Sequence, residues 1–153
     1  MIETREDYLA WLKEVPADIT EDRMWRTLVY RFALFLADDA WDDLEALGQE
    51  RRTWHVASQL GRSLDSISTN FSEGYGKWSV RDRVRFYEYA MTSARESRNW
   101  YFKARRVLGN KRSNLQISGV TQVIKMLTAI LDRERQRAQG SPPQHRSTLQ
   151  RRP

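Results

Sequence analysis

The sequence predicts an all-α protein: an antiparallel up-and-down four-helix bundle with a short N-terminal helical arm and a flexible basic C-terminal tail. Apolar residues recur three and four positions apart over four long segments, which is the period of one buried helical face. No segment alternates apolar and polar residues as a half-buried strand does. The corners between the segments are short, so sequence neighbours should pack antiparallel. The 153 residues suit one domain, divided into an arm (1–19), a bundle (20–138) and a tail (139–153).

The arm is expected to hold an amphipathic helix over residues 4–15, which Pro16 stops because proline has no amide hydrogen to donate. Thr20 is the expected N-cap of the first bundle helix, with acidic residues favourably placed in its first turn. This helix is predicted to run unbroken to Gly48. Its later turns carry five acidic residues that we expect on a solvated or subunit-pairing face: Asp38, Asp39, Asp42, Asp43 and Glu45.

The second helix is expected over residues 52–73, with its buried face on Ala57, Leu60, Leu64, Ile67 and Phe71. Gly74 follows where a helix C-cap favours positive φ, and Gly76 loosens the turn further. Asn70 is expected to hydrogen-bond across helices, and Glu73 to pair with Arg62 or with an arginine of the third helix. We interpret these four residues of the corner, Asn70, Glu73, Gly74 and Gly76, as structural, because buried polar groups need partners.

The third and fourth helices are predicted over residues 80–108 and from Ser113 to about residue 139. Ser79 is the expected N-cap of the third helix, and Gly109 is expected to close it. Ser113 followed three residues later by Gln116 has the pattern of a capping box for the fourth helix.

Charge is distributed unevenly along the chain, although the net charge is only +6. Residues 1–50 hold 5 basic and 13 acidic side chains, a net of −8, whereas residues 51–153 hold 21 basic and 7 acidic ones, a net of +14. An acidic and a basic part of the chain can pair within one fold or between subunits, and the excess of basic residues can attract polyanions.

The third helix carries a row of cations. At 100° per residue, five of them fall within about 40° of one line; we call them the cationic stripe: Arg81, Arg85, Arg95, Lys103 and Arg106. Only Glu88 interrupts it, whereas a solvated surface helix usually mixes signs so that residues four apart can pair. A plain solvated face is the alternative. The excess of cations favours a polyanion-binding surface, so these five are the candidate nucleic-acid-binding residues.

Six Trp and six Tyr are more large rings than one bundle core requires. Aromatic side chains are enriched at protein interfaces. The composition therefore favours a homo-oligomer in which some rings lie between subunits, with a bulky monomer core as the alternative.

A longer pattern runs through residues 58–63 (Ser-Gln-Leu-Gly-Arg-Ser), 70–76 (Asn-Phe-Ser-Glu-Gly-Tyr-Gly), 82–86, 92–96 and 104–109. With these elements at their offsets, roughly residues 20–137 resemble the bacterial "four helix bundle protein" family. That family includes proteins encoded in intervening sequences of 23S ribosomal RNA genes and the Avd accessory proteins of diversity-generating retroelements. The resemblance implies a homopentamer with a basic surface that handles RNA or cDNA templates, with a reverse transcriptase as a partner. The chain departs from the family pattern at Lys77 and Trp78, where an arginine and a small polar residue are frequent.

Catalytic and metal chemistry find little support. The absence of cysteine excludes disulfides and thiolate sites, and the two histidines, His55 and His145, do not form the Glu-x-x-His pairs of metal-binding bundles. Gly74 and Gly76 lack the other glycines and the preceding strand of a phosphate loop. We therefore expect no enzyme, no metal and no cofactor. No apolar run reaches membrane-spanning length, and the acidic N-terminus does not resemble a targeting peptide, so a cytoplasmic protein with no membrane role is expected.

Together these features predict a non-enzymatic homo-oligomer that binds RNA or DNA with low sequence specificity through the cationic stripe. The alternative is a protein-interaction scaffold, with no nucleic-acid role, whose basic faces meet acidic partner surfaces.

Overall fold

The computed structural model describes residues 1–140, and within them every regular element is helical. In chain order the elements are η1 (Ile2–Thr4), α1 (Glu6–Trp11), α2 (Ala17–Thr20), η2 (Arg23–Arg26), α3 (Leu28–Asp38), α4 (Trp41–Gln49), α5 (Trp54–Tyr75) and α6 (Val80–Gly140). The all-α prediction is confirmed. The predicted basic tail lies outside the described residues, apart from its first two positions, which end α6.

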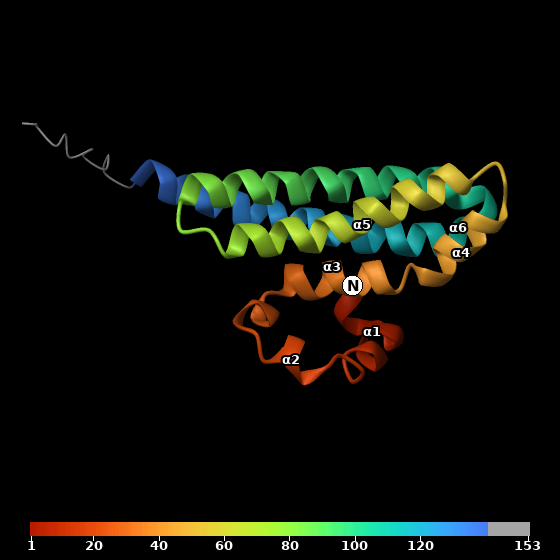
Figure 1. Cartoon of the computed structure of the whole chain (residues 1–153), viewed down its shortest axis with the longest axis horizontal. Helices are drawn as coiled ribbons and strands as arrows, with labels where there is room; N and C mark the ends of the chain where they lie inside the picture. The colour runs from red at the N-terminus through yellow and green to blue at the C-terminus, as the bar shows by residue number, and fades with distance from the viewer. Residues whose placement is uncertain (141–153) are drawn as a thin grey trace, which may run out of the picture.

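The segment labelled α6 is a hairpin of two antiparallel helices. Gly109 has φ 78° and ψ 154°, a conformation that side chains strongly disfavour. We call residues 80–108 the first limb and residues 110–140 the second limb. Ion pairs join Arg83 to Glu134 at 3.0 Å and Arg135 to Glu88 at 2.7 Å, so the second limb folds back along the first (Figure 1). Gly109 therefore closes the third bundle helix, as predicted.

Four rods make the bundle: α3 continued by α4, then α5, the first limb and the second limb (Figure 1). Each rod contributes fully buried apolar side chains to one core: Phe32, Leu36, Leu60, Leu64, Ile67, Phe71, Ala94, Ala104, Val123 and Leu127. The ring of Tyr87 stacks on Phe71 with centroids 4.9 Å apart. Burial of this kind, about 25 cal/mol for each Å² of apolar surface, is the main force that holds such a bundle together.

The first rod is not the unbroken helix that the sequence predicts. Thr20 ends α2 instead of capping a long helix. The Asp22 carboxylate accepts a hydrogen bond from the Met24 amide at 2.7 Å and so caps the short η2. The rod begins only with α3, and Asp39 and Ala40 separate α3 from α4.

The N-terminal arm packs into the same core as the bundle. Ile2 and Tyr8 are 1% and 3% exposed, and the Tyr8 ring meets Phe32 and Phe35 edge-on at 5.3 and 5.2 Å. The Ile2 amide donates to Gln122 Oε1 of the second limb at 2.9 Å. The single helix predicted over residues 4–15 is wrong: α1 is shorter, and α2 begins after Pro16.

The two predicted helix caps of the hairpin have opposite outcomes. Ser79 caps the first limb as predicted, because its hydroxyl accepts from the Asp82 amide at 3.4 Å. Ser113 does not cap a helix: it lies fully buried inside the second limb. Gln116, its expected capping partner, instead donates to Asp39 Oδ2 at 2.7 Å.

Candidate nucleic-acid interface

The first limb presents the cationic stripe on its outer face. All five members are exposed: Arg81, Arg85, Arg95, Lys103 and Arg106. The same helix buries Tyr87, Ala90, Ala94 and Tyr101 on its inner side. Because opposite faces of an amphipathic helix lie half a turn apart, burial of the apolar face holds the stripe outward.

Carboxylates neutralise little of the stripe. Arg85 lies 3.3 Å from Asp82, and both side chains are largely exposed; such surface pairs contribute little energy and are easily replaced. Within residues 1–140, Arg81, Arg95 and Arg106 make no ion pair. Lys103 Nζ lies 4.0 Å from the centroid of the Trp100 ring, an arrangement that leaves its charge uncompensated.

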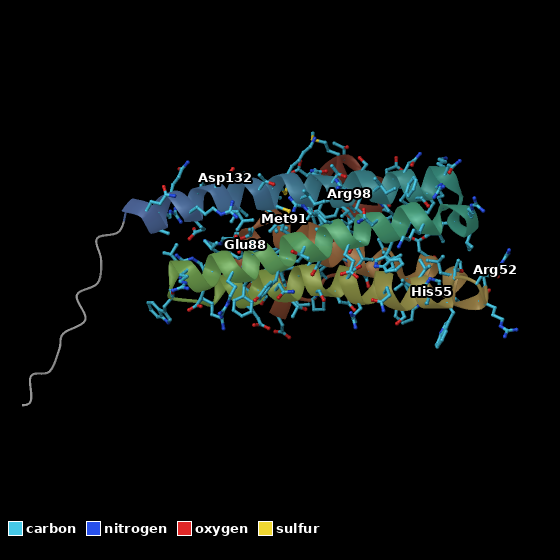
Figure 2. All side chains as sticks on the ribbon, turned by 90° about the horizontal axis from the view of Figure 1, so that it is seen from above. Arg52, His55, Glu88, Met91, Arg98 and Asp132 are labelled. Carbon is cyan, nitrogen blue, oxygen red and sulfur yellow. The ribbon has the colours of Figure 1, made fainter. Side chains whose placement is uncertain are left out.

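Glu88, the one acid in the stripe, pairs with Arg135 across the hairpin at 2.7 Å. A hollow of about 280 Å³ lies beside this pair, between the limbs. Figure 2 shows Glu88 and Met91 on the first limb next to Asp132 of the second. Arg95 and Arg135 also line the hollow, so its walls carry two arginines as well as the two acids, Glu88 and Asp132.

Three exposed aromatic rings close to the stripe are absent from the residues predicted to bind nucleic acid. They are Trp78 (99% exposed), Tyr89 (49%) and Phe102 (56%). The spacing that could have identified them is visible in the sequence, because each ring lies three or four positions from a stripe cation.

The corner between α5 and the first limb is built differently from the prediction. Gly74 is buried inside α5 with no positive φ, and Gly76 has φ −76°. A Cβ atom on Gly74 would lie 2.7 Å from the Tyr87 ring, so this glycine permits close helix packing and is not a C-cap. Asn70 donates to the Ser66 carbonyl of its own helix at 2.7 Å, not across helices. Glu73 is exposed and makes no ion pair within residues 1–140.

A buried polar network joins the break in the first rod to the second limb. Arg112 Nε donates to Asp43 Oδ1 at 2.9 Å, and the Tyr101 hydroxyl donates to Asp43 Oδ2 at 3.1 Å. The Arg112 guanidinium also donates to the backbone carbonyl of Asp39. Although burial opposes its charge, the hydrogen bond from Arg112 to Asp43 and the charges of Asp39 and Asp43 raise the pKa of Arg112. Burial beside Asp43 raises the pKa of Tyr101.

The prediction that the acidic residues of the first rod form one solvated or subunit-pairing face is therefore wrong for two of them. Asp43 is 5% exposed, and Asp39 accepts hydrogen bonds from Gln116 and, at 2.8 Å, from Arg5 of the arm. Their partners lie in the same chain. The other three are exposed as expected: Asp38, Asp42 and Glu45.

A family model described as "23S rRNA-intervening sequence protein" matches residues 26–129. The chain belongs to this family. The match contains the whole cationic stripe and the corner, and the arm residue Arg5 lies outside it.

One solved structure is similar to this member of the intervening-sequence protein family. It is a crystal structure of a protein of unknown function from the S23 ribosomal protein family of Bacteroides thetaiotaomicron, with a TM-score of 0.64 and 22% sequence identity. The similarity covers 68% of this chain and 98% of that one. At this identity it shows a shared fold. No curated protein matches the chain.

Metal-ligand clusters and membrane-spanning helices have no counterpart in residues 1–140. No three His, Cys, Asp or Glu side chains gather there as metal ligands would. None of the helices in that range has the length and apolar content needed to cross a bilayer. His55 is exposed beside the Trp100 ring, with centroids 6.3 Å apart, and His145 lies outside the described residues.

Proposed function

We propose that this intervening-sequence family member is a non-enzymatic, cytoplasmic homo-oligomer that binds RNA or DNA with low sequence specificity through the cationic stripe. The observation that carries the proposal is the exposure of all five stripe cations, of which Arg85 alone pairs with a carboxylate among residues 1–140. Arginine and lysine attract the phosphate backbone whatever the base sequence. The name of the family, which refers to 23S rRNA, agrees with a nucleic-acid ligand.

Self-association would raise the affinity of the protein for nucleic acid. One stripe offers few phosphate contacts, so a single subunit should bind weakly at physiological salt. Repetition of the stripe around a homopentamer, the assembly that the resemblance to Avd proteins implies, would convert later contacts into intramolecular ones. A reverse transcriptase is the further partner that this resemblance implies, and a reverse-transcriptase gene beside this one would support it.

The test is charge reversal of the stripe. The triple variant Arg81→Glu, Arg85→Glu, Arg95→Glu should lose retention of a mixed-sequence RNA in a low-salt gel shift. The matched control, Lys13→Glu, Arg23→Glu, Arg26→Glu, changes the net charge equally at exposed positions of the arm and η2, which lie outside the first limb and its stripe. It should still bind, and circular dichroism should show both variants folded.

Salt dependence separates the proposal from a protein-interaction scaffold. Binding through phosphates weakens steeply as salt rises, because bound counterions are released. A steep slope for both RNA and DNA is the expected result. Absence of binding at low salt would overturn the proposal and favour the scaffold, and equal binding by the stripe variant and the wild type would exclude this surface.

A further inference from the structure

Three exposed rings accompany the cationic stripe along the first limb. Trp78 stands three positions before Arg81, Tyr89 four after Arg85, and Phe102 four before Arg106. Residues three or four apart are neighbours on a helix surface. At 100° per residue, Tyr89 lies about 80° to one side of the Arg81 line and Phe102 about 60° to the other. The rings therefore flank the stripe on both edges, and Trp78 stands where the stripe begins.

Contacts within the chain interleave these rings with cations. The Arg105 guanidinium lies 4.0 Å from the Phe102 ring centroid. Tyr89 meets Phe86 edge-on at 5.9 Å, and Lys77 Nζ lies 4.7 Å from the Phe86 centroid. Neither the Trp78 indole nor the Tyr89 hydroxyl has a hydrogen-bond partner within residues 1–140. The polar ends of both rings are therefore left to solvent or to a ligand.

We infer that the ligand of this surface is single-stranded nucleic acid, whose unpaired bases stack on Trp78, Tyr89 and Phe102 while the stripe holds the phosphates. This inference rests on the proposed function and narrows its ligand class. Proteins that bind single strands combine a positive track with aromatic platforms, because every unpaired base offers a π-face. A duplex hides those faces within its base stack, so it can use the stripe but not the rings.

The rings have another conceivable use as contacts between subunits, because aromatic residues are enriched at interfaces. Their position among cations argues against a two-fold contact at this face, because that contact would bring like charges together. The solution mass of a variant without these rings tests the other arrangements of subunits. The near-complete exposure of Trp78, beside Lys77 and ahead of Arg81, fits a ligand that carries both charge and ring faces.

The experiment compares two ligands and one triple variant at a single salt concentration. The ligands are an unstructured oligo(dT), with oligo(U) as its RNA counterpart, and a mixed-sequence duplex of the same length. The variant Trp78→Leu, Tyr89→Leu, Phe102→Leu removes the rings but keeps apolar side chains and the net charge. Wild type should bind the single strands more tightly, and the variant should lose about 100-fold or more in that affinity, because the stacking of bases on all three rings is removed. Duplex affinity and solution mass should not change.

Tyr75→Leu is the matched control. Tyr75 is 43% exposed, but it lines a hollow with Thr27 and Ile130, away from the stripe, so single-strand affinity should remain. We also expect oligo(dT) to quench the tryptophan fluorescence of the wild type, and Trp78→Leu alone should reduce that quenching.

The possible outcomes separate the two proposals. Equal wild-type affinity for duplex and single strand, or unchanged single-strand affinity in the leucine variant, would overturn this inference while the stripe remained a binding surface. A changed solution mass in the variant would assign the rings to subunit contacts and overturn it as well. Binding of neither ligand by the wild type would overturn the proposed function itself.

Discussion

At the scale of single residues, Gly74 shows how a correct motif can carry a wrong explanation. The sequence marks it as a helix end, yet it lies inside α5 against the Tyr87 ring of the first limb. A local pattern shows that glycine is required but not whether backbone freedom or space is the reason. The distinction depends on a residue 13 positions away in the chain.

Gly74→Ala should destabilise the protein by about 1–3 kcal/mol, the usual cost of overpacking a well-packed site. The new Cβ would lie 2.7 and 2.8 Å from two Tyr87 ring atoms and 3.1 Å from Phe86 Cβ. The Phe71 ring, stacked on Tyr87, limits how far Tyr87 can retreat. Urea midpoints provide the measurement.

The control for this prediction is Gly48→Ala in α4, where no atom lies within 4 Å of the added carbon apart from adjoining residues and the backbone of the same helix. It should stabilise the protein by roughly 0.4–1 kcal/mol, because alanine restricts the unfolded chain more than glycine does. Shifts of the same sign in the two variants would contradict the packing explanation.

Tyr87 itself should make stability depend on alkaline pH. Burial, followed by the nearby charge of Glu134, raises the pKa of Tyr87 from 10.0 to about 12. Because the folded state resists ionisation of this ring, the stabilising contribution is complete below pH 10 and is lost as the pH rises through 12. Tyr87→Phe should therefore lose less stability than wild type between pH 10 and pH 12.

Urea midpoints of both proteins at pH 8, 10, 11 and 12 test this expectation. The Tyr87 hydroxyl has no hydrogen-bond partner within residues 1–140, so the two proteins should differ little at pH 8. Parallel curves for the two proteins up to pH 12 would show that Tyr87 is not the responsible group.

At the scale of helices, local rules succeed where a cap or turn is made by neighbours and fail where distant residues decide. Ser79 and Gly109 act within their own segments, and both were predicted correctly. The break between α3 and α4 was not, because the Asp39 carbonyl accepts a hydrogen bond from Arg112, 73 positions later. Helices bend or break where a side chain enters the backbone hydrogen-bond ladder, and periodicity along one segment cannot reveal such a partner.

Arg112→Leu should lower the free energy of unfolding by about 3–5 kcal/mol, because removal of the arginine leaves the buried Asp43 carboxylate without its countercharge. Arg112 is also the residue that bridges Asp39 and Asp43 across the break. Arg106 is exposed and lies six positions earlier. The free energy of unfolding of Arg106→Leu should stay within about 0.5 kcal/mol of the wild-type value. Chemical denaturation of both variants provides the comparison.

A second substitution separates charge burial from packing. If an unpaired carboxylate causes the loss, Asp43→Asn combined with Arg112→Leu should be more stable than Arg112→Leu alone. A double variant no more stable than the single one would instead attribute the loss to the shape of the Arg112 side chain.

At the scale of the whole molecule, the sequence predicted which helix is basic and which face of it is exposed, because both follow from one helical period. It did not predict that the arm completes the core. Tyr8 looks like part of the apolar side of a short independent helix, and Ile2 precedes that predicted helix. Only the tertiary structure places these two residues against Phe32 and Gln122. The acidic first rod was likewise misread in part, since Asp39 and Asp43 both pair with Arg112 of the second limb, and Asp39 also pairs with Arg5 of the arm.

The state of assembly is the remaining property of the whole molecule, and exposed tryptophans bear on it. Trp41 and Trp54, at the beginnings of α4 and α5, are 74% and 70% exposed. Aromatic side chains of this size are typical of subunit interfaces, and both lie within the matched family region. If the homopentamer implied by the resemblance to Avd proteins forms through these rings, light scattering should give a mass near five times the 18.1 kDa of one chain.

Trp41→Glu combined with Trp54→Glu should lower that mass, because two desolvated carboxylates would oppose burial of the same surface. Leu9→Glu provides the control: Leu9 is 48% exposed but belongs to the arm, outside the family region. If contact between subunits uses the tryptophans, only the first variant dissociates, and its nucleic-acid affinity falls through lost avidity although every stripe cation is intact. A wild-type mass of one chain would refute the assembly while leaving the stripe to be judged by charge reversal.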